Sequence, residues 1–336
     1  MAKRWQKLTE AVAGYENILI LLHDDPDPDA VASGEALRYL LAEKLGVKGQ
    51  IAHRGVIGRA ENRALVEYLD LSLLALPDEA FAVETGPQPV ALVDTQPGAG
   101  NSPLPADYPT ALVIDHHGEL ESENIVFRDV RPWIGASSTI LTQYLRAAEI
   151  KPPTSLATAL FYGIKTDTRG LSRDTSAADV GAYFYLLNFV DVDAVVEIEN
   201  AQVPTSYFKN LTRAMQAANV YDGVVISYVG QSDYPDLTAE MADLFLRLEG
   251  VNWVVCIGAY EDALYLSVRA RDEGADAEQL ARAIIGEQGT AGGRNTLAGG
   301  QIPLNGQDAD QLADEIRRRA LAYLDVAPGT SGESIV

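Results

Sequence analysis

The sequence is poor in the residues that support thiol chemistry. Its 336 residues include a single cysteine, Cys256, which cannot form a disulfide within the chain. The apolar stretch around Cys256 predicts a buried thiol in the hydrophobic core. The sequence therefore indicates neither redox chemistry nor zinc held by thiolates.

Basic residues are also scarce. Lysine and arginine together number 26 against 48 aspartate and glutamate residues, which gives a formal net charge of −22. Long nucleic acid is bound mainly by cationic side chains that contact its phosphates, so this balance argues against long nucleic acid as a partner. Clustered carboxylates can instead be neutralised by divalent cations.

Long hydrophobic runs are missing as well. No apolar stretch approaches the roughly 20 residues of a membrane-spanning helix, and none follows the basic residues near the start. We therefore expect a cytoplasmic protein with no membrane partner. A hydrophobic fraction of 47% predicts a globular chain, and the length predicts two domains.

Short apolar runs alternate with segments of helical periodicity in the first part of the chain. The expected strands cover 18–22, 47–52, 89–93 and 110–114, and the expected helices cover 30–45, 61–69, 139–148, 155–165 and 177–187. This alternation predicts an α/β fold with a doubly wound parallel sheet. We assign residues 1–190 to this first domain.

A different pattern follows a connector over 191–216. The expected strands cover 224–229, 253–260 and 263–269, the expected helices cover 238–248, 276–285 and 308–324, and a glycine-rich stretch covers 286–300. This pattern predicts a second, smaller mixed α/β domain over 217–326. A flexible tail is expected over 327–336.

Side chains suited to metal binding follow the expected strands of the first domain. They are His23, Asp27 and Asp29 after the first strand, Asp94 after the third, and Asp115, His116 and His117 after the fourth. The carboxyl ends of parallel strands share one sheet edge, which is the usual place for ligands. Imidazole and carboxylate together suit a divalent transition metal. Asp167, just past an expected helix, could complete the site.

Each of these segments also has a purely structural interpretation. The Asp- and Pro-rich run after His23 can be a solvated turn, Asp94 can cap a helix, and the histidine pair can be structural. Independent turns have no reason to place three of the four histidines beside isolated aspartates at one sheet edge. We therefore favour a metal site.

Four motifs built on these residues resemble those of the DHH phosphoesterase family. They read His23-x-x-Pro26-Asp27-x-Asp29-Ala30, Val93-Asp94-Thr95, Asp115-His116-His117 and Gly163-Ile164-x-Thr166-Asp167-Thr168. Segments 135–139, 267–269, 292–294 and 298–300 also resemble parts of this family, including its associated C-terminal domain. The resemblance covers nearly the whole chain.

The resemblance implies two Mn²⁺ ions, for which Co²⁺ or Mg²⁺ could substitute. The implied ligands are His23, Asp27 and Asp94 for the first ion, and Asp29, Asp94, His116 and Asp167 for the second. Asp94 would thus bridge the ions. Asp115 would orient His116 through a hydrogen bond, and His117 would face the substrate phosphate, which gives Asp94, Asp115, His116 and His117 the implied catalytic roles.

Substrate binding is also implied by the resemblance. The implied residues are His117, Arg269, Gly292, Gly293 and Arg294. Arg294 stands where family members often have a histidine, and an arginine can still place two donors on a phosphate.

The implied function is a manganese-dependent phosphoesterase acting on small phosphorylated nucleotides. The substrates would be short oligoribonucleotides or 3′-phosphoadenosine 5′-phosphate (pAp), as in the oligoribonuclease and pAp phosphatase branch. The alternatives are a hydrolase of cyclic dinucleotides, pyrophosphate or polyphosphate, and a non-catalytic nucleotide-binding module. A homodimer is compatible with the sequence.

Overall fold

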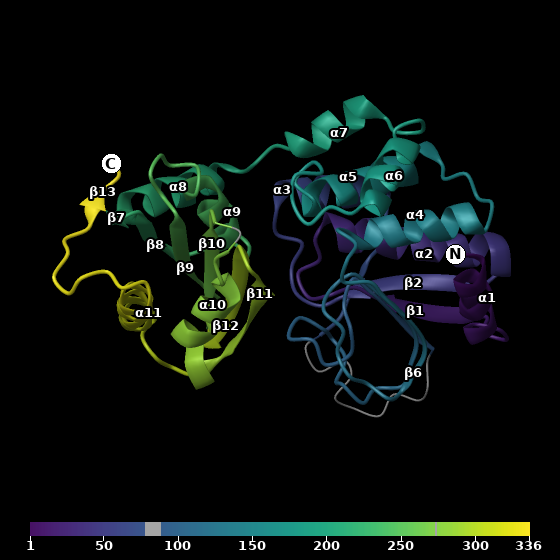
Figure 1. The fold of residues 1–336 in the computed structure, drawn as a ribbon, viewed down its shortest axis with the longest axis horizontal. Coiled ribbons are helices and arrows are strands. Elements are labelled where there is room, and N and C mark those ends of the chain that lie inside the picture. Colours follow the sequence, from purple (N-terminus) through teal and green to yellow (C-terminus); the bar gives the residue numbers. More distant parts are fainter. Residues whose placement is uncertain (78–88, 273) are drawn as a thin grey trace. The chain divides into compact units, whose positions relative to one another are not determined.

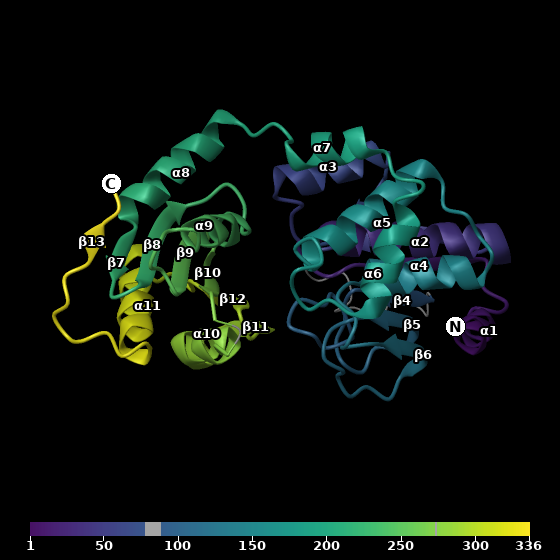
Figure 2. The same ribbon diagram turned by 45° about the horizontal axis from the view of Figure 1, so that its top comes forward.

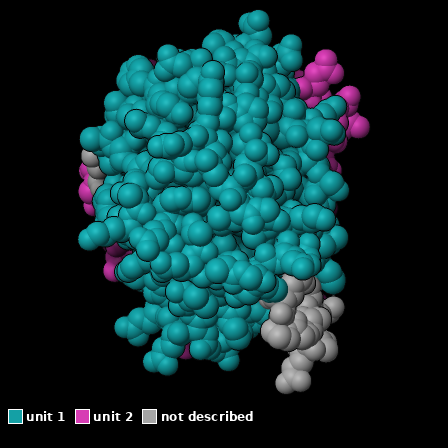
Figure 3. Space-filling model, turned by 90° about the vertical axis from the view of Figure 1, so that its right-hand side faces the viewer, with its two compact units in different colours: residues 1–201 teal, residues 202–336 magenta. Residues whose placement is uncertain are grey.

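The computed structural model describes residues 1–77, 89–272 and 274–336. The chain forms two compact units, Met1–Ala201 and Gln202–Val336 (Figure 3). The division between them lies inside segment 191–216, where we expected a connector. Within the described ranges, no helix combines the length and the apolar character that crossing a membrane requires.

A six-stranded, all-parallel sheet forms the centre of the first unit. In spatial order its strands are β3 (Leu74–Ala75), β2 (Lys48–His53), β1 (Asn17–Leu21), β4 (Val90–Val93), β5 (Thr110–Asp115) and β6 (Ile125–Val130). The strand order therefore reverses between β1 and β4, which are neighbours. The expected α/β fold with a parallel sheet is confirmed.

Helices cover one face of this sheet. The helices of the unit are α1 (Ala2–Ala11), α2 (Pro28–Leu45), α3 (Ala60–Tyr68), α4 (Ser137–Ala147), α5 (Thr154–Asp167), α6 (Ala177–Leu186) and α7 (Val192–Glu199). Helices α2, α4 and α5 pack together (Figure 1). Their apolar side chains form one core with Ile20, Ala91 and Leu112 of the strands. On the other face, Leu92 and neighbouring strand residues pack with Leu104. Burial on both faces explains why the strand sequences are continuously apolar.

A seven-stranded mixed sheet forms the centre of the second unit. In spatial order its strands are β11 (Thr290–Arg294), β12 (Leu297–Pro303), β10 (Ala263–Ala270), β9 (Trp253–Tyr260), β8 (Val224–Gln231), β7 (Asn219–Tyr221) and β13 (Glu333–Ser334). Strands β8 and β9 are parallel, and the other pairs are antiparallel. The sheet is thus built mainly from neighbouring antiparallel strands.

Helices lie on both faces of this second sheet (Figure 2). They are α8 (Thr205–Ala217), α9 (Leu237–Phe245), α10 (Ala277–Ile285) and α11 (Ala309–Tyr323), with a 3₁₀ turn at Gly286–Gln288. Side chains of α10 and α11 share a core with Ile226, Val255 and Ile257. Ser227 follows Ile226 on β8, and neighbouring residues of a strand point to opposite faces of the sheet. Its hydroxyl donates to the Ala214 carbonyl of α8 on the other face.

Several strands were not expected from the sequence. The glycine-rich stretch 286–300 contains β11 and most of β12, and the expected flexible tail contains β13, which pairs with β7. Glycine permits the close approach here, because a Cβ at Gly300 would lie 2.4 Å from the Thr290 carbonyl oxygen. Helix α1 and strand β6 were also not predicted.

Arg54 joins three loops at the carboxyl edge of the parallel sheet. Its Nε and Nη2 atoms donate to the Asp24 carboxylate at 2.8 and 2.6 Å, and Nη2 donates to the Ser102 carbonyl at 3.0 Å. The Asp24 N–H donates to the Asn101 carbonyl at 2.8 Å. These contacts connect the segments that follow β1, β2 and β4.

We expect Asp24→Ala to destabilise the first unit by about 1–3 kcal/mol, because it leaves the Arg54 guanidinium without its paired carboxylate. The free energy of unfolding measured in urea checks this. The matched control is Asp107→Ala, which removes an exposed aspartate and should stay within about 0.5 kcal/mol of the original chain. Equal stability of the two variants would contradict the role given to Asp24.

Candidate metal centre

The candidate site lies at the carboxyl edge of the parallel sheet. His23 follows β1, Asp94 follows β4, and His116 follows β5. Strands β1 and β4 are neighbours at the point where the strand order reverses. Open parallel sheets bind ligands at this point, because the loops on its two sides run in opposite directions and leave a crevice.

The first motif is also the start of helix α2. The Asp27 Oδ1 atom accepts the Ala30 N–H at 3.0 Å and caps the helix, and Pro28 occupies its first turn. Proline is favoured there because its missing N–H would have no partner inside the helix. The Asp- and Pro-rich run is therefore a helix start that also brings carboxylates to the sheet edge.

Asp94 has an unusual backbone conformation. Its φ is +63°, in the left-handed region that non-glycine residues rarely adopt. Its N–H donates to the Ile114 carbonyl at 2.9 Å, and its Oδ1 atom accepts the Ser137 hydroxyl at 2.8 Å. Backbone strain of this kind is typical of functional positions.

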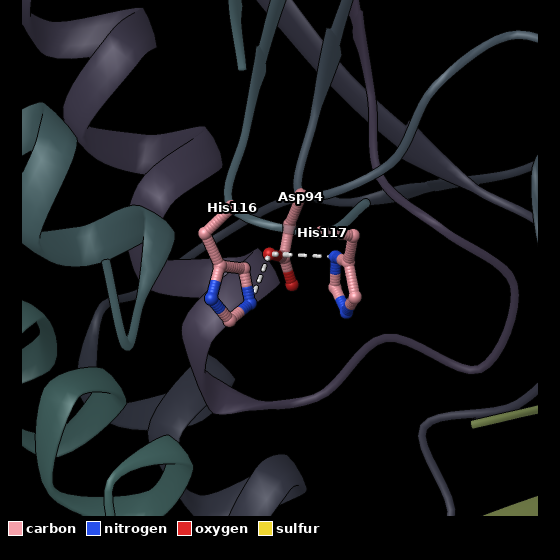
Figure 4. A group of neighbouring side chains, drawn as sticks. All are labelled: Asp94, His116 and His117. Carbon is pink, nitrogen blue, oxygen red and sulfur yellow. Dashed lines mark ion pairs between the residues drawn. The ribbon is translucent and has the colours of Figure 1, made fainter. Parts of the chain in front are cut away.

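The candidate ligand atoms form three overlapping groups. The groups are His23, Asp27 and Asp94; Asp29, His116 and Asp167; and Asp94, His116 and His117. Figure 4 shows the last of these groups. Within each group the ligand atoms lie no more than 4.8 Å apart. All six residues that the sequence suggested as metal ligands are thus among those brought together here.

The two carboxylate oxygens of Asp94 face different histidines. The His23 Nε2 atom lies 3.6 Å from Asp94 Oδ2 and 3.7 Å from Asp27 Oδ1. The His116 Nε2 atom lies 3.4 Å from Asp94 Oδ1 and 3.3 Å from Asp167 Oδ2. Asp94 therefore stands between two groups of potential ligands.

The orientation of both histidines suits metal binding. His23 Nδ1 lies 2.7 Å from the Asp24 carbonyl oxygen, and His116 Nδ1 lies 3.2 Å from that of Ile134. Because a carbonyl oxygen only accepts hydrogen bonds, Nδ1 of each ring donates to it, and Nε2 is the ring atom turned toward the carboxylates. Imidazole nitrogens and carboxylate oxygens that converge in this way are the donor types of divalent transition-metal sites. The donor set therefore fits a divalent metal ion.

Asp29 belongs to the first turn of α2, and its fully buried side chain lies against the start of helix α4. Its Oδ2 atom accepts the Ser137 N–H at 2.6 Å, and its Oδ1 atom accepts the Ser138 N–H at 2.8 Å. The N–H groups of a helix start stabilise a negative charge. Gly163 of α5 leaves the necessary room, because a Cβ there would lie 2.5 Å from Ser138 Oγ and 3.0 Å from Asp29 Oδ1.

Burial and mutual repulsion act on the central carboxylates. Burial, together with the charge of Asp167, raises the pKa of Asp29 to about 7. Burial and the neighbouring carboxylates, Asp29 first among them, raise the pKa of Asp94 well above its usual range. A bound cation would relieve both effects, which is a second reason why the donor set fits a divalent metal.

The structure corrects the expected role of Asp115. We expected its carboxylate to orient His116, but Asp115 Oδ1 lies 2.8 Å from Nδ1 of His117, while His116 is held by the Ile134 carbonyl. The reason is geometric, because Asp115 Oδ1 also accepts the N–H groups of His116 and His117, which draws the carboxylate toward the second ring. Burial opposes ionisation of Asp115, but the hydrogen bond and charge of His117 outweigh it and lower its pKa below the usual range.

The residues that the sequence suggested in the second unit lie on strands of its sheet. Arg269 of β10 is buried, and its Nε and Nη1 atoms donate to Asp243 Oδ1 at 2.7 Å and to Ser267 Oγ at 2.9 Å. Gly292 and Arg294 lie on β11, the end strand of the sheet, where Gly292 pairs with Gly299. A Cβ at Gly293 would lie 2.4 Å from the Ala298 Cα atom, so this position requires glycine.

Sequence reasoning missed two residues that support the site. Ser137 donates to Asp94, and Gln96 donates to Asp115 at 2.8 Å. Ser137 lies in segment 135–139, which resembles part of the DHH family, but the resemblance gave this serine no role in the site. No pattern marks Gln96, because its contacts join loops that are separated in the sequence.

Comparison with known proteins shows relatives over most of the chain. The chain is 36% identical over 292 residues to an uncharacterized protein of Methanocaldococcus jannaschii, a match that covers 85% of this chain and 58% of that protein. It is 26% identical over 161 residues to a probable manganese-dependent inorganic pyrophosphatase of Streptococcus pyogenes, which covers 47% of this chain and 50% of that protein. The chain thus spans little more than half the length of these curated relatives. No family model matches it.

A solved structure matches nearly the whole chain. An exopolyphosphatase-related protein of Bacteroides fragilis superimposes with a TM-score of 0.69 at 14% identity, covering 96% of this chain and 97% of that protein. The two proteins have the same fold. At this identity the likeness extends to the architecture and carries no information about the substrate.

We expect divalent metal binding to release protons in a pH-dependent way. Asp29, with a pKa near 7, is mostly protonated at about pH 6 and must lose its proton to become a ligand, whereas at about pH 8 it is already ionised. Proton release should therefore fall, and apparent Mn²⁺ affinity should rise, between these pH values. In the metal-free protein, folding raises the pKa of Asp29 from its ordinary value of 3.8 to about 7, so the folded state holds a proton that the unfolded state has lost between these pH values. The free energy of unfolding should therefore fall as pH rises from about 4 to about 7.

Calorimetric titration with Mn²⁺ in buffers of different ionisation enthalpy measures the proton release. The exposed Asp107→Asn variant is the control and should behave like the original chain. Proton release that is the same at both pH values would contradict the elevated pKa of Asp29.

Proposed function

We propose that the chain is a phosphoesterase of the DHH type that depends on two divalent ions, most effectively Mn²⁺. Its substrates are small phosphorylated nucleotides, either short oligoribonucleotides or pAp. The observation that carries this proposal is the position of Asp94, whose two oxygens face His23 and His116 in two separate groups of ligand atoms. Six residues from four motifs meet there, and a chance cluster of surface acids would not include two oriented histidines.

The residues of the site have different proposed roles in such a reaction. Bound divalent cations would activate water and neutralise the charge that develops on the phosphoryl oxygens. Asp29, Asp94 and Asp167 supply negative charge to hold them, and Ser137 fixes the Asp94 carboxylate. His117 lies at the outer side of the group, with 42% of its side chain exposed, and is the group that faces the substrate phosphate.

The comparisons support phosphate chemistry and manganese. A relative is named a probable manganese-dependent inorganic pyrophosphatase, and the match to it covers about half of this chain. This observation favours a second candidate function, the hydrolysis of inorganic pyrophosphate. We place it second because the match to that relative covers only 47% of this chain and 50% of that protein.

The second unit is proposed to bind the rest of the substrate. Arg294 would place guanidinium donors on a second phosphate, and the backbone of Gly292 and Gly293 would approach it closely. Arg269 is a weaker candidate than the sequence suggested, because Asp243 already compensates its charge. This arrangement would select small nucleotides over phosphate esters that carry a single anionic group.

We expect the purified chain with Mn²⁺ to hydrolyse a diribonucleotide or pAp faster than inorganic pyrophosphate or cyclic di-AMP. Release of phosphate and of nucleotide products measures this. The control is Asp94→Asn, which should abolish turnover and lower the bound metal found by elemental analysis. Turnover of pyrophosphate alone would favour the second candidate, and metal and nucleotide binding without turnover of any substrate would favour a binding module.

We expect Arg294→Ala to lower kcat/KM for the nucleotide roughly 10- to 200-fold, because it removes a charge-assisted hydrogen bond worth about 1.5–3 kcal/mol. The loss should be much smaller for p-nitrophenyl phosphate, which offers no second phosphate to bind. Steady-state kinetics on both substrates checks this. Equal losses would mean that Arg294 supports the fold, and the proposed phosphate contact would be wrong.

A further inference from the structure

The side-chain amide of Gln96 connects the loops that follow β4 and β5. Gln96 is only 2% exposed and lies two residues after Asp94. Its Nε2 atom donates to Asp115 Oδ2 at 2.8 Å and to the Gly118 carbonyl at 2.8 Å, and its Oε1 atom accepts the Leu120 N–H at 3.0 Å. Both amide protons and the amide oxygen are thus engaged.

These partners fix the orientation of the amide. A carboxylate and a carbonyl only accept hydrogen bonds, and the Leu120 N–H only donates, so the alternative amide orientation would set oxygen against oxygen twice. A glutamine is therefore the residue type that satisfies all three partners at once.

Asp115 transmits this constraint to His117. Oδ1 of Asp115 accepts from His117 Nδ1 at 2.8 Å and from the N–H groups of His116 and His117, while Oδ2 accepts from Gln96. The carboxylate is 1% exposed on its side chain, so each of its oxygens depends on these protein donors. Gln96 also holds the backbone of Gly118 and Leu120 in the loop that follows His117.

The ring of His117 is thereby oriented outward. Its Nδ1 atom faces Asp115 and lies 3.9 Å from Asp94 Oδ1, and its other ring nitrogen points away from Asp94 (Figure 4). With Nδ1 donating to a carboxylate, Nε2 is left to contact a ligand. The ring is half-exposed, so packing alone would not hold it in this position.

We propose that Gln96 is the positioning residue for His117, and that it acts through Asp115 and through the 118–120 loop. The role in turnover rests on the proposed phosphoesterase function, because His117 is the group assigned to the substrate phosphate. Gln96 contacts none of the six residues proposed as metal ligands through its side chain, and His117, whose Nδ1 faces Asp115, is not one of the six. Gln96 should therefore act on substrate handling and leave metal binding intact.

The test compares Gln96→Met, which keeps the length but removes the hydrogen bonds, with the original chain. We expect kcat/KM for pAp to fall about 10- to 100-fold, as for other residues that orient an active-site group, with unchanged Mn²⁺ content. In a His117→Ala background the same substitution should change kcat/KM by less than about twofold, because the group it positions is absent. The matched control is Gln143→Met. Gln143 lies on α4 and accepts a hydrogen bond from Arg131, and this variant should retain activity.

A second variant guards against failure to fold. Gln96→Asn keeps the amide but is one methylene shorter, so it cannot reach Asp115, Gly118 and Leu120 together, and the same losses are expected. Full activity of either folded variant, equal losses with and without His117, or loss of bound Mn²⁺ in proportion to activity would each overturn the proposal.

A readout that does not depend on turnover separates this proposal from the proposed function. Nitrogen NMR of ¹⁵N-histidine protein, with the His117 signals assigned by their absence in His117→Ala, should show Nδ1 of His117 protonated in the original chain. In Gln96→Met these signals should move toward those of a mobile imidazole. Unmoved signals would overturn the role of Gln96, whereas the expected NMR shifts in a chain that hydrolyses no phosphate substrate would overturn the phosphoesterase function alone.

Discussion

The repulsion between buried carboxylates at one sheet edge is the constraint on which the first unit depends. Asp29 and Asp94 are excluded from water, which opposes their ionisation, and neighbouring carboxylates add to this effect, Asp167 at Asp29 and Asp29 at Asp94. Part of this cost is offset within the protein by the N–H groups at the start of α4 and by the Ser137 hydroxyl. The remainder is what a divalent cation would offset, so that metal affinity, pH dependence and stability are coupled in this unit.

The three histidines of the site are oriented by two kinds of partner, and this difference assigns their chemistry. Backbone carbonyls orient His23 and His116 and turn their Nε2 atoms toward the carboxylates, which is what a metal ligand requires. A carboxylate orients His117, whose other ring nitrogen points away from Asp94. His117 is therefore proposed to contact the substrate, and the support of Asp115 by Gln96 would give that contact a fixed direction.

Two arginines of the second unit, Arg269 and Arg294, have different surroundings. Arg269 is enclosed by the sheet, Asp243 and Ser267, and so contributes mainly to the internal hydrogen bonding of the unit. Arg294 stands on β11, the end strand of the sheet, next to Gly292 and Gly293. The same residue type thus serves the fold at one position and is proposed to serve recognition at the other.

The sequence by itself determined strands β1, β2, β4 and β5 of the parallel sheet and the six candidate ligands, because continuous apolar runs specify buried strands and three of the four polar motifs begin where such a run ends. It did not determine β11, β12 or β13, because glycine-rich and tail segments become strands only when a neighbouring strand offers hydrogen bonds. Nor did it determine that Asp115 orients His117, or that Gln96 supports Asp115. Those contacts were decided by the tertiary structure, since residues far apart in sequence meet only after parallel strands bring their carboxyl ends to one edge.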